Sequence, residues 1–308
     1  MSLRARLLNG WLRRIEKPAM MRAAGPEQLR KRLELQARLF FHAPRGTQMQ
    51  WQVLAHEQAR IEALEVVPAN LDTNLVVLYL HGGGFVFGSP QAYSALAGQL
   101  AQRLRARVIL PRYRLAPEHP YPAALEDCRI AWNGLIASGV AADQIVIGGD
   151  SAGGALALSL LGQLAQEAAQ MPVATFCFSP LTDLSFASDS FHENAEKEAV
   201  LPAARAHEMA ALYLDGQEET DPRVSPVFAT FSGAAPVWLT VGNTEILRDD
   251  SRRMAEVLKR DGVDVTFVEE QDLPHVWPFF HNTLPEARKT LDVLTEWIRR
   301  KQVRQGES

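Results

Sequence analysis

The heptapeptide GGDSAGG at residues 148–154 stands between a short apolar stretch, QIVI at 144–147, and a longer one, ALALSLLGQLA at 155–165. The first stretch predicts a buried strand and the second predicts a helix. A G-x-S-x-G motif at such a junction is typical of a sharp turn, in which the serine backbone is strained and its neighbours must be very small. We therefore expect Ser151 at the end of a sheet, above a helix N-terminus that favours negative charge. The simpler alternative is a glycine-rich turn in which the serine has no role.

Strand-like and helix-like stretches alternate on both sides of this turn. Parallel strands must be joined by crossovers, and helices are the usual crossovers. The sequence therefore predicts an α/β fold with helices on both faces of the sheet, preceded by two antiparallel strands within residues 50–69. Apolar strand-like runs occur at 75–82, 106–114, 144–147, 173–180, 237–243 and 265–270, and helix-like patterns at 92–105, 123–139, 152–168, 247–260 and 285–300.

The composition excludes several classes of protein. Of the 308 residues, 47% are hydrophobic and 22% are charged, which is typical of a packed globular protein and not of a disordered or collagen-like chain. The formal net charge of -4 argues against nucleic acid as a partner, because binding to phosphates needs an excess of Lys and Arg. Cys128 and Cys177 lie in apolar stretches, so we expect buried thiols in a reducing compartment, the cytoplasm.

Two segments stand outside the alternation. Residues 1–45 hold eleven Lys or Arg against three acids, and they lack the apolar run of a secretory signal or of a membrane span. We expect Pro18, Gly25 and Pro26 to divide this segment into short helices with a solvated face; a helix that lies on a membrane surface is the alternative. Residues 184–231 form a polar excursion between two strands, and together the two segments are candidates for a lid.

The sequence HGGG at residues 81–84 directly follows the apolar run LVVLYL. Its backbone N–H groups are expected at the carboxyl end of the sheet, where open α/β sheets bind ligands. A nucleophilic serine needs N–H donors for the oxyanion that its attack creates. We assign this role to the N–H groups of Gly83, Gly84 and Ala152; a tight loop that uses glycines only for their geometry is the alternative.

Three motifs together resemble one protein family. HGGGFVFGS at 81–89, YRLAPEHPYPAALED at 113–127 and GGDSAGG at 148–154 resemble the hormone-sensitive-lipase-like group of α/β-hydrolases, the bacterial family IV carboxylesterases. The resemblance covers residues 50–300. It implies an α/β-hydrolase fold, with a mostly parallel eight-stranded sheet flanked by helices and covered by a helical cap.

The same resemblance implies a division of the chain and a chemistry. Residues 1–45 would contribute N-terminal cap helices, and residues 46–308 would form the catalytic domain, with 184–231 as a cap insertion. Ester hydrolysis would proceed through a Ser-acid-His triad, without a metal or an organic cofactor.

The base of the triad is sought among the histidines that follow Ser151, because this fold orders its triad Ser, acid, His. His192 and His207 lie in the insertion. His275 follows the strand VTFVEE and is expected on a loop at its carboxyl end, as in the family. His281 lies in an aromatic stretch, where a packed or surface imidazole is the simpler interpretation. We therefore predict His275 as the base.

The acid departs from the family pattern. Family members usually have Asp-Pro-Leu after the strand that precedes the histidine strand, whereas this chain has Glu245 at the matching position and Asp249 four residues later. A glutamate can orient an imidazole, since the requirement is a carboxylate that accepts from Nδ1–H. We predict Glu245, on the loop, as the acid. Asp249 is the alternative; with Asp250 it is expected in the first turn of the next helix, where its charge is favourable.

The remaining motif residues are expected to be structural. His81, Gly82 and Asp150 are assigned supporting roles beside the two glycine-rich loops. Arg114 and Glu118 are expected to pair and so brace the loop at 81–84. The chain lacks H-E-x-x-H, and two cysteines cannot build a structural zinc site, so neither a metal nor a cofactor is expected.

The sequence therefore predicts a serine carboxylesterase in which Ser151 attacks the ester, His275 moves the proton and Glu245 orients the imidazole. The expected partner is a small-molecule ester, with short or medium acyl chains favoured by a cap of the family type, and a homodimer is left open. Hydrolysis of lactones or amides uses the same residues and stays an alternative. A non-enzymatic receptor on this scaffold is disfavoured, because all three triad roles are filled.

Overall fold

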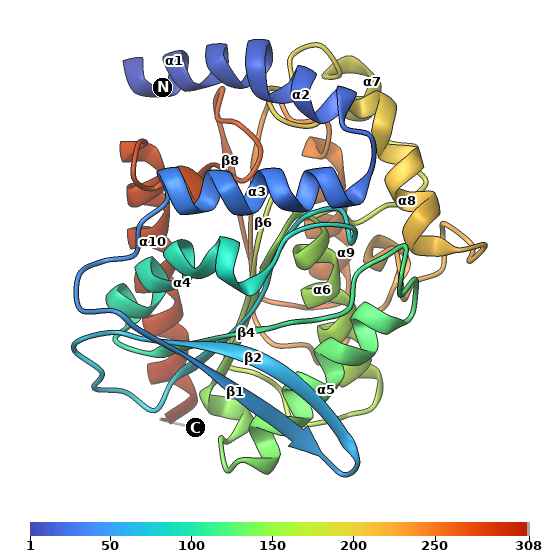
Figure 1. The fold of residues 1–308 in the computed structure, drawn as a ribbon. Coiled ribbons are helices and arrows are strands. Elements are labelled where there is room, and N and C mark those ends of the chain that lie inside the picture. Colours follow the sequence, from blue (N-terminus) through green and yellow to red (C-terminus); the bar gives the residue numbers. More distant parts are fainter. Residues whose placement is uncertain (307–308) are drawn as a thin grey trace.

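One eight-stranded sheet forms the centre of the computed structural model, which describes residues 1–306 (Figure 1). The strand order is β1-β2-β4-β3-β5-β6-β7-β8. β1 and β2 pair antiparallel with each other, and β2 pairs antiparallel with β4, whereas all strands from β4 to β8 are parallel. The predicted α/β fold with a mostly parallel sheet is confirmed. The strands are β1 Gln48–His56, β2 Ala59–Val67, β3 Val76–Leu80, β4 Arg107–Pro111, β5 Ile145–Asp150, β6 Ala174–Phe178, β7 Val237–Gly242 and β8 Val265–Glu270.

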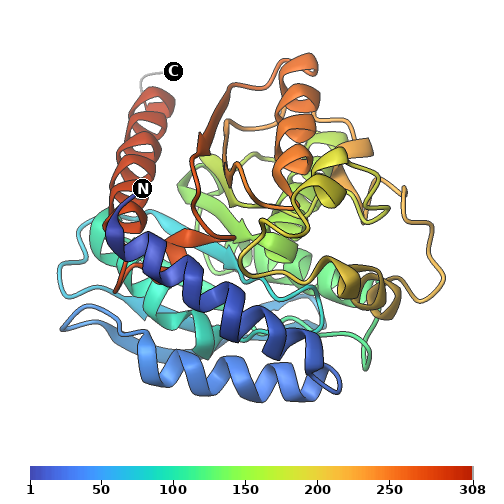
Figure 2. The ribbon, with the colours of Figure 1, turned by 90° about the horizontal axis from the view of Figure 1, so that it is seen from above.

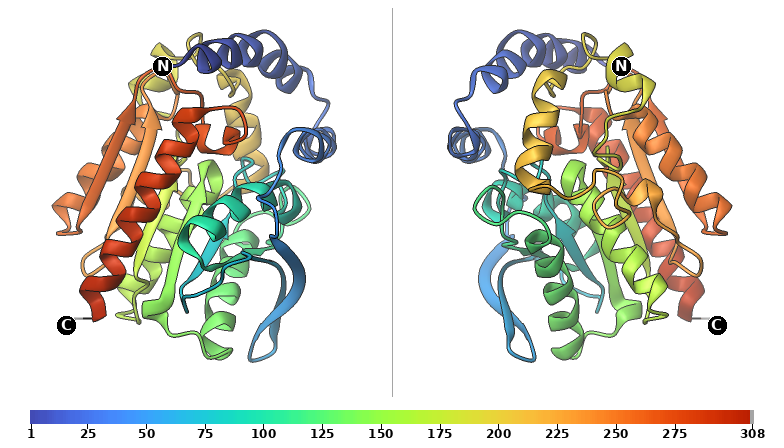
Figure 3. Two further views of the ribbon diagram at one scale, coloured as in Figure 1. Left: turned by 90° about the vertical axis from the view of Figure 1, so that its left-hand side faces the viewer. Right: turned by 90° about the vertical axis from the view of Figure 1, so that its right-hand side faces the viewer.

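Helices cover both faces of this sheet. Side chains of successive strand residues point to opposite faces, so Val77 and Tyr79 of β3 pack in one core and Leu78 and Leu80 in the other. Figure 3 presents each face in turn. The first core is closed by α4 Pro90–Leu104 and α10 Pro285–Gly306, and the second by α5 Ala123–Ala137, α6 Ser151–Gln166 and α9 Arg248–Arg260.

The N-terminal segment is more continuous than its sequence predicts. α1 Leu3–Trp11, the π-helix η1 Leu12–Glu16 and α2 Lys17–Arg22 follow one another without a gap, so the expected break at Pro18 was wrong. Pro18 stands at the junction of η1 and α2, where the hydrogen-bond register changes, and its missing N–H is tolerated there. The break at Gly25 and Pro26 is confirmed, and α3 Pro26–Phe40 begins after it. Among the residues described, no helix has both the length and the apolar character that a bilayer span requires.

The N-terminal helices and residues 184–231 meet over the carboxyl ends of the parallel strands. In Figure 1 the helices from α1 to α2 cross the top of the molecule with α3 below them, and in Figures 1 and 2 the insertion helices lie beside the α2 end. The guanidinium of Arg205 donates to the carbonyls of Met20 (3.1 Å) and Ala23 (2.5 Å). The assignment of both segments to a cap stays a prediction. The insertion contains α7 Asp189–Glu193, η3 Ala203–Arg205, α8 Ala206–Leu214 and η4 Pro226–Phe228.

Deletion of residues 1–45 should loosen the loop after β8 without unfolding the sheet. Ala5 packs against Leu273 and Trp277, and the side-chain amide of Asn9 donates to the carbonyl of Asp272 (2.7 Å). We expect near-native far-UV circular dichroism, a rise in ANS fluorescence from newly exposed apolar surface, and increased aggregation. Unchanged ANS fluorescence together with an unchanged unfolding midpoint would make the segment peripheral.

Candidate active site

Ser151 lies where β5 ends and α6 begins. Its φ of +50° is in the left-handed region, which costs a non-glycine residue on the order of 1–3 kcal/mol. Two glycines make the turn possible. A Cβ on Gly149 would lie 2.3 Å from the carbonyl oxygen of Gly153, and a Cβ on Gly153 would lie 2.1 Å from that of Leu80. The structure thus has the strained strand-to-helix turn that the sequence predicts.

The carboxylate of Asp150 ties this turn to the loop at 81–84. Its Oδ1 accepts hydrogen bonds from the hydroxyl of Tyr79 (2.8 Å) and the N–H of Gly82 (3.0 Å), and its Oδ2 accepts from the hydroxyl of Tyr93 (3.0 Å). Burial raises the pKa of Asp150 to about 6, against the opposing effect of the two tyrosine hydrogen bonds. At neutral pH the carboxylate is therefore mainly ionised and holds the two glycine-rich loops in register.

His81 supports the same loop from behind. Its ring stacks on that of Tyr113 at 4.3 Å between centroids, and the Tyr113 hydroxyl donates to the His81 carbonyl (2.7 Å). Burial lowers the pKa of His81 to about 4, so this imidazole is neutral at physiological pH. Its environment is that of a packed structural group.

Three backbone N–H groups remain available beside Ser151. Gly83 has a φ of +122°, and a Cβ there would lie 2.1 Å from the Phe87 carbonyl oxygen, so only glycine fits. Within the described residues, the N–H groups of Gly83, Gly84 and Ala152 donate to no protein acceptor. These are the groups that the sequence assigns to an oxyanion.

Glu245 and His275 meet at the ends of two neighbouring parallel strands. Glu245 follows β7 and His275 follows β8, and the Oε2 of the carboxylate lies 2.6 Å from Nδ1 of the imidazole. The other carboxylate oxygen, Oε1, accepts from the N–H of Gly242 (2.6 Å) and the hydroxyl of Ser179 (2.8 Å). Both side chains are buried, with 0% of Glu245 and 6% of His275 exposed. The carboxylate is therefore fixed in orientation before any substrate binds.

The charges around His275 favour its protonated form. Burial by itself lowers the pKa of the imidazole, but the hydrogen bond and the charge of Glu245 act against it, followed by the charges of Glu198 and Asp150. The net result is a pKa above the ordinary 6.5. Such an imidazole is a stronger base than a free histidine.

Asp249 lies elsewhere. In the first turn of α9, its Oδ1 accepts from Nε of Arg248 (2.8 Å) and its Oδ2 from the N–H of Ser190 (2.9 Å). The Arg248 hydrogen bond is the main reason why the pKa of Asp249 lies below its ordinary value. In the described part of the chain it makes no hydrogen bond with a histidine. Its position in the first turn of α9 is the one that the sequence predicts.

Of the four histidines that follow Ser151, only His275 has a carboxylate within hydrogen-bonding distance among residues 1–306. His281 is buried, with its ring 6.4 Å from that of Phe41. His192 and His207 lie edge-on to the ring of Phe191. These three imidazoles are packed against aromatic side chains.

The expected pair of Arg114 and Glu118 does not form, and this prediction was wrong. The guanidinium of Arg114 instead donates to the carboxylate of Asp127 at 2.9 Å, and the backbone N–H of Arg114 donates to the same carboxylate at 2.7 Å. Glu118 is bound in a two-pronged ion pair by Arg30 of α3, at 2.8 and 2.7 Å. A spacing of four residues brings side chains together on a helix, but this segment is a loop. The brace on the loop therefore comes from the N-terminal helices.

Three residues that contact Glu245 or its neighbour Ile246 were not predicted from the sequence. The hydroxyl of Ser179, at the end of β6, donates to Glu245 and accepts from the N–H of Val276 (3.2 Å). Its position at a strand end next to β7 was the signal that could have identified it. In the insertion, the Asn194 amide donates to the Glu245 carbonyl (2.9 Å), and the Glu198 carboxylate accepts from the N–H of Ile246 (3.2 Å). Neither has a recognisable sequence signal.

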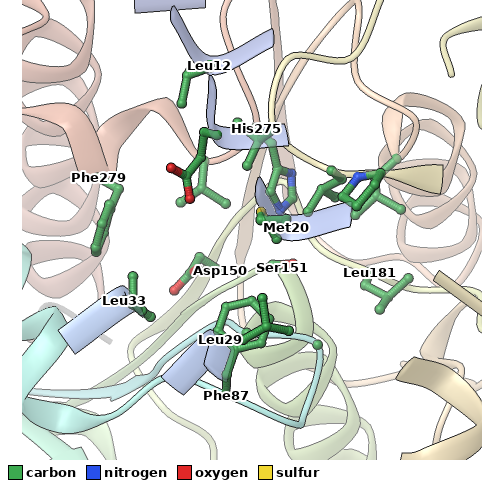
Figure 4. Close-up of a pocket in the computed structure, with 18 of the residues that line it drawn as sticks. Leu12, Met20, Leu29, Leu33, Phe87, Asp150, Ser151, Leu181, His275 and Phe279 are labelled. Atoms are coloured by element: carbon green, nitrogen blue, oxygen red, sulfur yellow. The ribbon is translucent and has the colours of Figure 1, made fainter. Parts of the chain in front are cut away.

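Ser151 and His275 line one cavity of about 430 Å³ (Figure 4). Its walls are mainly apolar, and in Figure 4 the labelled apolar side chains surround Ser151 from several sides. Among residues 1–306, no three His, Cys, Asp or Glu side chains gather as a group able to hold a metal ion. A hydroxyl, a carboxylate-bound imidazole and free N–H donors on one apolar cavity are the parts that nucleophilic acyl transfer needs. Apolar side chains on its wall include Leu12, Met20, Leu29, Phe87, Leu181 and Phe279.

Comparison with known proteins gives one consistent family. A model of the α/β hydrolase fold matches residues 77–279. An acetyl-hydrolase of Streptomyces hygroscopicus is 36% identical over 76% of this chain and 78% of its own, and an esterase of Acinetobacter venetianus is 33% identical over 92% and 91%. Among solved structures, an esterase from the bacterial hormone-sensitive lipase family superposes with a TM-score of 0.91 at 31% identity, covering 98% of this chain and 99% of its own. The esterase EstE5, soaked with p-nitrophenyl butyrate, gives 0.91 at 32%, covering 98% and 100%.

The turn at Ser151 should not tolerate a methyl group at Gly153. Gly153→Ala places a Cβ against the carbonyl oxygen of Leu80, at the end of β3, and that of His81 in the loop that follows, and we expect a loss of at least about 3 kcal/mol in the free energy of unfolding. Gly25→Ala, where nothing lies within 4 Å of the new methyl, is the matched control; because Gly25 is the N-cap of α3, we expect a cost of about 1 kcal/mol or less. Urea unfolding of both variants makes the comparison, and equal midpoints would refute the steric argument.

Proposed function

Because this chain belongs to the α/β-hydrolase fold family, and within it to the bacterial hormone-sensitive-lipase-like esterases, we propose that it is a serine carboxylesterase acting through Ser151, His275 and Glu245. The observation that carries the proposal is the 2.6 Å contact between Nδ1 of His275 and the buried carboxylate of Glu245, on a cavity that also holds Ser151. A carboxylate in that position fixes the tautomer of the imidazole and leaves Nε2 free to accept a proton.

In the first half of the reaction, the Ser151 oxygen attacks the ester carbonyl carbon while His275 takes the hydroxyl proton. The carbonyl oxygen becomes an oxyanion, and the N–H groups of Gly83, Gly84 and Ala152 are the donors aimed at it. Glu245 stabilises the imidazolium. The tetrahedral intermediate collapses when His275 passes the proton to the departing alcohol oxygen, which leaves the acyl group on Ser151.

In the second half, water replaces the alcohol. His275 takes a proton from the water as its oxygen attacks the acyl carbon, and the same N–H groups hold the second oxyanion. Collapse returns the proton to Ser151 and releases the carboxylic acid. Each cycle consumes one ester and one water and leaves the enzyme unchanged.

The cavity supports a substrate with short or medium acyl chains. Its apolar wall suits a hydrocarbon chain, and its volume of about 430 Å³ lies within the usual range for small-molecule sites. The similarity to a protein named acetyl-hydrolase and to an esterase soaked with p-nitrophenyl butyrate supports the same size class. Hydrolysis of a lactone or an amide would use the same residues and stays the alternative. The cytoplasmic location and the homodimer stay predictions of the sequence.

Ser151→Ala should abolish covalent labelling by a fluorophosphonate, because the probe reacts only with an activated serine hydroxyl. We expect ester turnover to fall by several orders of magnitude, as removal of a triad nucleophile does. Mass spectrometry of the labelled peptide and hydrolysis of p-nitrophenyl butyrate are the two measurements. Label on another serine of a folded variant would show that the nucleophile is misassigned.

Glu245→Gln should lower turnover by roughly 10² to 10⁴, because an amide of nearly the same shape cannot stabilise the imidazolium. The apparent affinity for substrate should change less, since the imidazolium exists only as the reaction proceeds. Asp249→Asn is the matched control and should cost little, given its contacts with Arg248 and Ser190. Both variants must keep the wild-type unfolding midpoint. If Asp249→Asn loses turnover and Glu245→Gln keeps it, the acid of the triad is Asp249.

The acid limb of the pH profile should lie above pH 6.5. His275 must be unprotonated to accept the serine proton, and its pKa is above that ordinary value, so kcat/KM rises with pH through the raised pKa. In Glu245→Gln the acid limb of the residual activity should lie at a lower pH than in the wild type, because a neutral amide replaces the carboxylate that raises the pKa of His275. Rates from about pH 5 to about pH 9 at constant ionic strength measure this. A wild-type limb below pH 6.5 would contradict the raised pKa.

A further inference from the structure

A second polar group lines the cavity, apart from the predicted triad. Nε and Nη2 of Arg32 donate to the two carboxylate oxygens of Glu16 at 3.1 and 2.6 Å, and the amide of Gln36 donates to the same carboxylate at 2.7 Å. We call these three residues the Glu16 cluster. All three line the cavity, and Glu16 and Arg32 are its only charged wall residues besides Asp150 and His275 in the described part of the chain.

The N-terminal helices carry this cluster. Glu16 ends the π-helix η1, while Arg32 and Gln36 lie one turn apart on α3. π-Turns inside helices are frequent at functional sites, and this one puts both Leu12 and Glu16 on the cavity wall. Figure 4 shows Leu33, the neighbour of Arg32 in the chain, on the opposite side of Ser151 from Leu181 in this view. Because Glu16, Arg32 and Gln36 line the same cavity as Ser151, a chain bound in that cavity can contact them.

An ion pair in an apolar wall is costly for stability. Glu16 is 8% exposed, whereas the side chain of Arg32 is 34% exposed, so the cost of leaving water falls mainly on the carboxylate. α1 to α3 already have apolar contacts to hold them, such as the packing of Met20 against Leu29. The cluster therefore offers something that an apolar wall lacks, namely hydrogen bonding to a ligand.

The atoms that the cluster leaves free define that ligand. Among residues 1–306, Nη1 of Arg32 has no acceptor and Oε1 of Gln36 has no donor. The two N–H groups on Nη1 and the amide oxygen together suit a hydroxyl group, which can accept from the guanidinium and donate to the amide oxygen. The carboxylate of Glu16 compensates the charge of Arg32, so the cluster has no net charge to attract an anion.

We propose that the Glu16 cluster is a subsite for an uncharged oxygen group, above all a hydroxyl, on the part of the ester remote from the scissile carbonyl. This rests on the esterase activity proposed above and narrows its substrate class. The preferred substrate is an ester with a hydrocarbon segment ended by a hydroxyl, either on the acyl side or on the alcohol side. A plain alkyl chain of the same length leaves the free donor and acceptor of the cluster unpaired.

The test compares isosteric esters in which a terminal methyl is exchanged for a hydroxyl. Ethyl alkanoates and ethyl ω-hydroxyalkanoates of graded length probe the acyl side, and alkyl acetates and monoacetates of α,ω-diols probe the alcohol side. In an apolar cavity the hydroxyl lowers kcat/KM at every length. For the wild type we expect the ratio of hydroxyl to methyl substrate to reach a maximum, above one, at a single length on one side.

Two variants assign that maximum to the cluster. Glu16→Leu combined with Arg32→Met removes both charges together, so that neither is left unpaired, and should lower the ratio at its maximum by at least about tenfold. Gln36→Met keeps the ion pair and should lower the ratio as well, which covers the case in which the double variant folds poorly. Glu27→Leu with Lys31→Met is the matched control, because it removes an exposed ion pair of α3 that lies outside the cavity wall, and it should keep the wild-type ratio.

Three results would overturn the subsite. The ratio could fall smoothly with length in the wild type, it could be unchanged in both cluster variants, or an ω-carboxylate could be preferred over the hydroxyl at every length. In each case plain alkyl esters would still be hydrolysed and Ser151 would still react with a fluorophosphonate. Failure of the proposed esterase function would instead abolish both, so the two failures are distinguishable.

Discussion

The left-handed backbone of Ser151 is the constraint on which the rest of the site depends. A non-glycine residue holds this conformation only if its surroundings enforce it. Here β5, α6 and the loop at 81–84 approach so closely that a single methyl group on Gly149 or Gly153 would collide with main-chain oxygens. The Asp150 carboxylate then links the turn to the N–H of Gly82. The serine hydroxyl and the proposed oxyanion donors are therefore parts of one rigid unit.

The second part of the site is electrostatic. β7 and β8 are parallel neighbours, so the loops that follow them bring Glu245 and His275 to the same edge of the sheet. Burial disfavours charge on the imidazole, and the buried carboxylate outweighs that effect. A buried carboxylate is tolerated because Ser179 and the N–H of Gly242 also donate to it. The same hydrogen bonds prevent it from rotating away from the histidine.

Two cationic side chains of the N-terminal helices bind main-chain carbonyls of the neighbouring segments. Lys17 donates to the carbonyls of Ala195 (2.6 Å) and Glu198 (3.0 Å), and Arg30 donates to those of Val86 and Ala116 (both 2.8 Å). The N-terminal helices are thereby joined both to the insertion and to the loop that carries two of the proposed oxyanion donors. In turn, Asn194 and Glu198 of the insertion hold the backbone beside Glu245. These contacts connect the helices that form the cavity wall to the backbone that positions Glu245.

The sequence by itself determined the parts of this protein that are local in the chain. Apolar runs and their alternation determined the α/β fold, and glycine spacing determined the turn at Ser151. Positions at strand ends, together with the family resemblance, singled out Glu245 and His275 as candidates. Tertiary structure alone decided the contacts between segments far apart in sequence: Arg30 with Glu118, Ser179 with Glu245, and Glu16 with Arg32 on the cavity wall. The physical reason is that backbone conformation depends on neighbouring residues, whereas an ion pair or a buried hydrogen bond depends on which surfaces packing brings together. For the same reason Pro18, read locally as a break, lies within a continuous helical segment whose register shifts through a π-turn.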